Sequence, residues 1–102
     1  MPLNAGQQQE LRDAVLEFLT LRHPCAFTLE AIIRMVQRRQ LVDFDFGTAD
    51  AASAVSFWKD LGNVADDSDA RSDVVPAYRA TAAGVAHVQR RRIAQHPEEA
   101  EA

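Results

Sequence analysis

Cysteine and long hydrophobic runs are what this chain has least of. Cys25 is the only cysteine among 102 residues, which excludes an intramolecular disulfide and makes a reducing compartment the simpler expectation. No segment approaches the run of about 20 apolar residues that crosses a bilayer. The N-terminal segment lacks the basic and apolar regions of a secretory signal. We therefore expect a cytoplasmic protein with no membrane partner.

Positive charge is also in short supply. Lysine and arginine together number 11, against 15 aspartates and glutamates, which gives a net charge of -4. This balance provides no general attraction to nucleic acid or to an anionic membrane, so such contact would need a local basic patch. Apolar residues make up 47% of the chain and charged residues 25%, proportions that are typical of a globular domain with a packed core.

Motifs for catalysis and metal binding are missing as well. The sequence has no glycine-rich phosphate loop, no nucleophile elbow and no paired carboxylates in a suitable context. His23 and Cys25 offer at most two metal ligands, and Arg71 interrupts the ligand pattern that a calcium loop over residues 67–78 would require. We expect a protein that is not an enzyme and binds no metal or cofactor. We also expect Cys25 to be buried as a small apolar residue.

The spacing of apolar residues predicts two helices in the first half of the chain. We expect one helix over residues 7–22, ending before Pro24, because the residue preceding a proline is pushed out of the helical region. A second helix is expected over residues 29–40, with Thr28 as its N-cap.

Two further helices are expected in the second half. One runs from residue 48 or 49 to Leu61, and Gly62 is placed to stop it as the residue after the C-cap. The other starts at the N-cap Thr81 and continues to residue 94 or 95. Its apolar side is expected from Val85, Ala86, Val88 and Ile93.

Extended structure is expected in the remaining segments. Residues 25–27 form a short extended piece, and residues 41–46 alternate apolar and acidic side chains as a half-buried extended segment does. Residues 64–66 and 73–79 flank a polar run, which predicts a β-hairpin. Pro76 lacks an N–H, so its strand is expected at the edge of the sheet.

These elements predict a single, mainly α domain with a small β-hairpin. It would span residues 7–95, between a flexible N-terminus (residues 1–6) and an acidic flexible tail (residues 96–102). We expect one shared core, formed by Phe18, Ile33, Val36, Val55, Trp58 and Leu61.

Two sequence segments and the order of the predicted elements resemble those of the winged helix-turn-helix superfamily. VSFWKDLGNV (residues 55–64) resembles the end of a winged-helix third helix and its exit into the wing. YRATAAGV (residues 78–85) is similar to the Tyr-x-(Leu/Ile)-Thr-x-x-Gly phrase that follows the wing in MarR-like and PadR-like bacterial regulators. The resemblance covers roughly residues 7–94. One departure is the segment 41–47 between the second and third helices, where a turn of about 3–4 residues is usual.

The resemblance implies a fold and a way of binding. The tyrosine at 78 would end the second wing strand, Thr81 would cap the last helix, and Gly84 would permit close packing. In winged-helix DNA-binding proteins the third helix enters the major groove and the wing touches the adjacent backbone. Such regulators usually bind two half-sites as homodimers, so a homodimer is expected here.

Candidate DNA contacts lie on three elements. Ser53, Ser56 and Lys59 lie on or beside the polar side of the third helix, although such residues are also ordinary helix surface. The second helix carries basic residues at 34, 38 and 39, and the wing tip carries one at 71. The full candidate set is Arg34, Arg38, Arg39, Ser53, Ser56, Lys59 and Arg71.

Each basic group also has a structural explanation. Arg34 is placed for an ion pair with Glu30 one helical turn earlier. The three arginines at 90–92 are placed to complement the C-terminus of the last helix.

A protein-binding adaptor is the alternative to DNA binding. Residues 47–79 contain three positive side chains and six aspartates, a net charge of -3, and such a face repels phosphates. Asp67 and Asp69 at the wing tip would then face a basic protein surface, and Phe57 at the edge of the third helix would anchor the contact. The sequence therefore predicts a small winged-helix regulator that binds double-stranded DNA, with this adaptor as the alternative.

Overall fold

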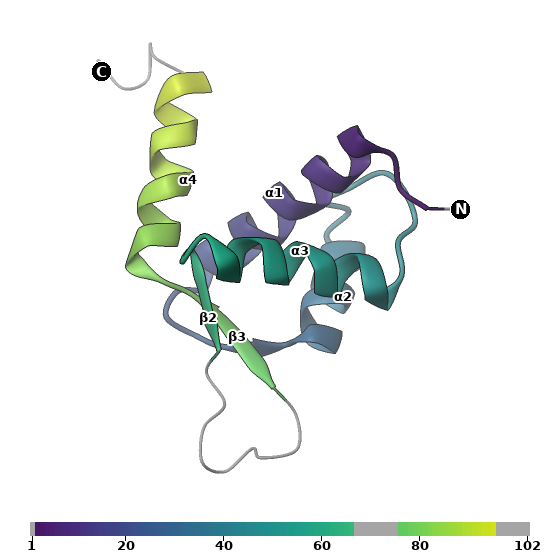
Figure 1. The fold of residues 1–102 in the computed structure, drawn as a ribbon, viewed down its shortest axis with the longest axis horizontal. Coiled ribbons are helices and arrows are strands. Elements are labelled where there is room, and N and C mark those ends of the chain that lie inside the picture. Colours follow the sequence, from purple (N-terminus) through teal and green to yellow (C-terminus); the bar gives the residue numbers. More distant parts are fainter. Residues whose placement is uncertain (1, 67–75, 96–102) are drawn as a thin grey trace.

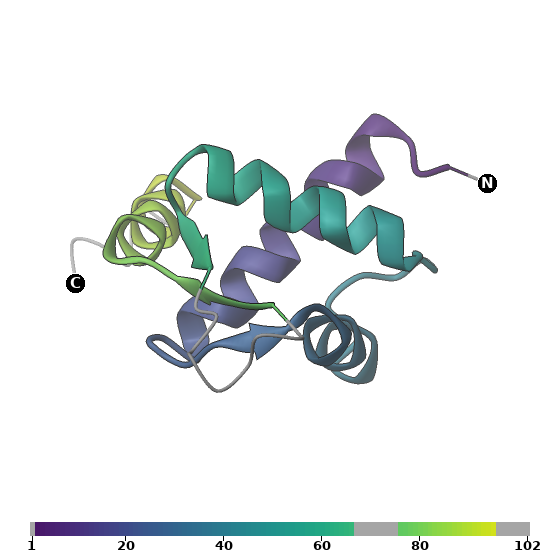
Figure 2. The ribbon, with the colours of Figure 1, turned by 60° about the horizontal axis from the view of Figure 1, so that its bottom comes forward.

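The computed structural model describes residues 2–66 and 76–95 of the chain. Figure 1 shows α3 crossing α1, with α2 and α4 at opposite ends of this pair, and Figure 2 shows the same arrangement from below. The elements in chain order are α1 (Ala5–Leu21), β1 (Phe27–Thr28), α2 (Leu29–Arg38), α3 (Thr48–Asp60), β2 (Val64–Asp66), β3 (Ala77–Ala80) and α4 (Ala82–Gln95).

The first two helices begin at side-chain caps. Asn4 accepts a hydrogen bond from the backbone N–H of Gln7 at 2.8 Å, and the Gln7 side chain accepts one from the Asn4 N–H at 3.1 Å. This reciprocal capping box satisfies two orphan donors, so α1 begins at Ala5, two residues before the predicted start. Thr28 caps α2 by accepting from the N–H of Ala31 at 3.2 Å, which confirms the predicted start of α2.

The exit of α3 and the start of α4 are tied together. Gly62 has a φ of 82°, the left-handed conformation predicted for the residue that stops α3. The Thr81 hydroxyl donates to the Gly62 carbonyl oxygen at 2.8 Å and accepts from the N–H of Gly84 at 3.1 Å. Thr81 therefore caps α4, as predicted, and also fixes the start of α4 against the end of α3.

The sheet has three antiparallel strands in the order β1-β3-β2. The short extended piece after α1 thus joins the hairpin strands by pairing Phe27 with Tyr78. The predicted edge position for the strand of Pro76 is wrong, because β3 lies in the middle of the sheet. Pro76 itself is exposed and precedes the first residue of β3, so its missing N–H removes no ladder hydrogen bond. The other residues predicted at the start of this strand, 73–75, lie outside the described residues.

The segment between α2 and α3 alternates in burial without forming a strand. Val42, Phe44 and Phe46 are half-buried against the core, whereas Asp43 and Asp45 are exposed. The alternation of the sequence therefore predicts burial correctly. Because no strand lies beside this segment in the described sheet, its backbone forms no ladder.

The core lies between α1, α2 and α3 and extends to the sheet and to α4. Phe18, Val36, Val55 and Trp58 are buried there as predicted, whereas Ile33 is only half-buried. Helical periodicity therefore identifies the shared core but not how completely each side chain is covered.

Three residues that were expected to be buried are exposed. Leu61 is 58% exposed because it is the C-cap, one residue beyond the last turn of α3 that contacts the core. Ile93 is 55% exposed because it points away from α1. Arg91, two residues earlier, faces α1, and two residues correspond to a rotation of about 200° around a helix. Cys25 is exposed because it lies at the end of the turn that contains Pro24, before β1 begins.

Candidate nucleic-acid interface

Three arginines in the C-terminal half of α2 and at its C-cap are exposed to solvent. Arg34 and Arg38 are one helical turn apart and therefore share a face, and Arg39 is the C-cap residue beside them. Within residues 2–66 and 76–95, none of the three forms an ion pair or a side-chain hydrogen bond. The predicted ion pair between Glu30 and Arg34 is therefore not formed. We call Arg34, Arg38 and Arg39 the α2 arginine group.

The arginines of α4 are arranged differently. Arg91 contacts Asp13 at 2.8 Å and Glu17 at 3.3 Å, and Arg92 reaches Glu17 at 3.8 Å. These pairs join α4 to α1, a role that the helix-end interpretation of the arginine run does not indicate. Because Asp13 and Glu17 are 78 and 74 positions from Arg91 in the chain, no local pattern reveals them.

Lys59, the cation predicted at the end of the third helix, is also partnered. Its Nζ lies 2.8 Å from a carboxylate oxygen of Asp66 and 5.7 Å from the ring centroid of Tyr78. The hydrogen bond to Asp66 raises the pKa of Lys59 above its ordinary value of 10.5. The ammonium is therefore charged at neutral pH, and its charge is balanced by Asp66.

The two serines predicted as DNA contacts lie where α3 is open to solvent. Ser53 and Ser56 are exposed, and their spacing of three residues places them on one side of the helix. Since α2 packs against α3, the serines and the α2 arginine group lie on neighbouring helices.

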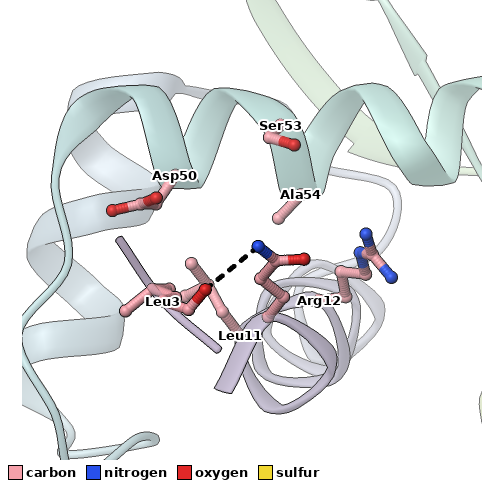
Figure 3. A pocket seen from close by; sticks show the side chains of 7 residues that line it. Leu3, Leu11, Arg12, Asp50, Ser53 and Ala54 are labelled. Atoms are coloured by element: carbon pink, nitrogen blue, oxygen red, sulfur yellow. Dashed lines mark hydrogen bonds between the residues drawn. The ribbon is translucent and has the colours of Figure 1, made fainter. Parts of the chain in front are cut away.

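A small hollow separates the start of α1 from α3. Figure 3 shows Leu3, Leu11 and Ala54 facing one another there, with Asp50 and Ser53 on α3 above them. Its volume is about 30 Å³, which is room for only a few water molecules. This hollow is too small for a metabolite-sized effector.

A larger and more open groove of about 360 Å³ lies beside the end of α2. It is lined by Gln37 and residues 42–46. The sequence indicates that apolar and acidic residues alternate in this segment, but it does not predict the groove. A groove depends on how the segment is placed relative to α2 in three dimensions.

Phe57, the predicted interface anchor, is covered from within the chain. The guanidinium carbon of Arg12 lies 4.2 Å from its ring centroid, and Trp58 meets the ring edge to face at 5.0 Å. Trp58 also donates from Nε1 to the Arg12 carbonyl oxygen at 2.7 Å. Phe57 is thus half-buried as part of the α1–α3 contact.

Three of the predicted site residues, Arg71, Asp67 and Asp69, lie outside the described part of the chain. Among the residues that are described, no three His, Cys, Asp or Glu side chains gather closely enough to hold a metal ion. None of the described helices combines the length and the apolar character needed to cross a bilayer.

Comparisons of the chain with family models, with curated proteins and with solved structures found no match. The described residues define a mainly helical protein with four helices and a small three-stranded antiparallel sheet. The α2 arginine group is an exposed basic feature of the described surface.

Proposed function

We propose that this protein is a winged-helix DNA-binding regulator whose α2 arginine group contacts the phosphates of double-stranded DNA. The observation that carries the proposal is the concentration of three exposed arginines, unpaired within the described residues, in α2 and its C-cap. The cations of the neighbouring α3 and of the inner side of α4 are instead neutralised by carboxylates.

The winged-helix part of the proposal is supported by the order of the elements and by one junction. The order α1, β1, α2, α3, β2, β3, α4 is that of the superfamily which the sequence resembles. The contacts of Thr81 and Gly84 are those that the resemblance implies for the residues after the wing. The role that this likeness suggests is that of a cytoplasmic, non-catalytic regulator of transcription.

Arginine is well suited to the proposed contact. Its planar guanidinium presents several donors and binds phosphate in a bidentate way, and it is less strongly hydrated than an ammonium. Ser53 and Ser56 on the neighbouring α3 would contact phosphates or base edges with their hydroxyls. Sequence preference would therefore come from α3, and most of the affinity from α2.

The adaptor alternative has less support. It requires Phe57 as an exposed anchor, and Arg12 and Trp58 cover that ring. Its acidic residues Asp67 and Asp69 lie outside the described residues, so nothing in the described fold adds to it.

The salt dependence expected for DNA binding by one copy of the protein can be estimated from the number of its phosphate contacts. Each neutralised phosphate contributes a slope of about -0.9 in log K against log salt, so three arginines give a total of about -2.7. This is shallow for a regulator that must find one site in a genome. We therefore propose a homodimer, in which a second copy doubles the number of neutralised phosphates.

The test is fluorescence anisotropy with a labelled mixed-sequence duplex at low and moderate salt. R34A/R38A should weaken binding to all sequences and flatten the salt slope by about 0.9 for each phosphate that is no longer neutralised. R22A/R90A removes the same charge from two arginines that are exposed elsewhere, so its slope should equal that of the wild type. Absence of binding at low salt would end the DNA proposal.

A further inference from the structure

Lys59, Asp66 and Tyr78 form a cluster where α3 meets the sheet. Asp66 and Tyr78 are directly opposite each other in the β2–β3 register, and opposed residues of antiparallel strands point to the same face. Lys59 in the last turn of α3 reaches both: its Nζ lies 2.8 Å from Oδ2 of Asp66 and 5.7 Å from the centre of the Tyr78 ring.

Lys59 is the only lysine of the chain, and in this cluster its ammonium is paired with Asp66. A carboxylate oxygen at hydrogen-bond distance from Nζ takes the same place that an anionic phosphate oxygen would take. Lys59 is therefore balanced by the chain itself, at the end of a helix whose exposed side carries Ser53 and Ser56.

The ion pair is displaceable. Both side chains are partly exposed to solvent, and ion pairs of this kind are weak because water and salt screen them. The pKa of Lys59 is raised mainly by the hydrogen bond to Asp66, so the ammonium does not lose its charge when that carboxylate leaves at neutral pH.

We propose that Asp66 competes with DNA phosphate for Lys59, so that Asp66 and Tyr78 hold this lysine out of DNA contact. They are positioning residues that lower the affinity of the α3 side for DNA and leave the α2 arginine group as the main phosphate contact. A partner that neutralised Asp66 would release Lys59 and add one phosphate contact. This inference rests on the proposed DNA binding.

The experiment is a double-mutant cycle over K59A and D66N, read by anisotropy of a labelled mixed-sequence duplex across a salt series. D66N keeps the shape of the side chain and removes its charge. It should raise affinity by about fivefold at low salt and steepen the salt slope by about 0.9, the value for one additional neutralised phosphate. K59A alone should leave the wild-type slope unchanged, and K59A/D66N should lose the steepening.

The matched control is D60N. Asp60 is adjacent to Lys59 in the chain, is exposed and holds no ion pair in the described structure. Its neutralisation changes the net charge by the same amount, so it should raise affinity through the general potential but leave the slope unchanged. Equal slopes for D66N and D60N would overturn the inference, as would steepening that survives K59A.

The outcomes separate this inference from the proposed function. If R34A/R38A has no effect while the Lys59 and Asp66 changes remain coupled, the competition between Asp66 and phosphate for Lys59 holds and the α2 arginine group is not the main phosphate contact. If R34A/R38A weakens binding while the cycle shows no coupling, the proposed function holds and the inference is wrong. If no variant binds the duplex at low salt, both are wrong. Thermal unfolding checks that D66N is folded, and D66T, with a β-branched residue suited to a strand, repeats the measurement.

Discussion

Gly84 lies so close to Asn63 that a Cβ atom at position 84 would be 2.2 Å from the Asn63 carbonyl oxygen. That oxygen also accepts a hydrogen bond from the N–H of Thr81 at 3.0 Å. The first turn of α4 therefore packs directly against the backbone of Asn63, just after α3. Only glycine, with a hydrogen atom as its side chain, fits at position 84.

The first prediction concerns this close approach. G84A should destabilise the protein by about 1–3 kcal/mol, because the added methyl group must push the backbone at Asn63 away. Elsewhere in a helix the same change is favourable by about 0.5–1 kcal/mol. G6A in α1 is the control, since its Cβ would meet only the Asn4 side chain at 3.4 Å. Chemical denaturation followed by circular dichroism measures both. A G84A variant as stable as G6A would show that the two segments are not in contact.

The second prediction concerns the arginines of α4. R91A should destabilise the protein by about 1–2 kcal/mol, because it leaves Asp13 and Glu17 without their shared partner in a partly buried contact. R90A removes an exposed arginine, unpaired within the described residues, from the adjacent position and should change stability by less than about 0.5 kcal/mol. The difference should shrink at high salt. Equal effects of the two changes in a urea titration would contradict the α1–α4 ion pairs.

The starts and ends of helices are the part of the fold that local sequence predicts well. As helix caps, Thr28 and Thr81 act on residues three positions away, and Gly62 acts through its own backbone conformation, so these capping roles are visible in a short stretch of sequence. The early start of α1 has a local cause too, because Asn4 followed by Gln7 has capping-box spacing. The predicted start at residue 7 rests on apolar periodicity alone and therefore misses this cap.

The candidate site is predictable only in part. The exposure of Arg34 and Arg38 follows from helical periodicity, but the charge balance of Lys59 depends on strand register, which places Asp66 and Tyr78 together. The partners of Arg91 are likewise fixed by how α4 packs on α1. Periodicity indicates which face a residue occupies, whereas pairing across elements requires the tertiary arrangement.

The third prediction concerns the titration of Lys59. Its folded-state pKa lies above the ordinary value, so the stability contributed by its ion pair is fully present below the ordinary pKa and is lost as the pH rises through the folded value. Stability differences between the wild type and K59M should therefore be constant from neutral to mildly alkaline pH and fall only above the ordinary lysine pKa of 10.5. D66N should lower the Lys59 pKa, as measured by NMR of the side-chain carbons. An unchanged pKa in D66N would mean that Asp66 is not the cause of the shift.

The last prediction concerns the homodimer. Leu21 at the end of α1 is 61% exposed and Ile93 on the outer side of α4 is 55% exposed. Leu21 shares a surface hollow with the half-buried Val85 of α4, and we expect a two-fold partner to cover the exposed apolar side chains of α1 and α4. L21E/I93E should convert a dimer to a monomer in light scattering and weaken DNA binding, because only one α2 arginine group then engages at a time. L41E introduces the same kind of charge at an exposed leucine after α2 and should leave the dimer intact. A wild-type protein that is monomeric at high micromolar concentration would exclude the dimer, and the α2 arginine group would then have to bind DNA as a single copy.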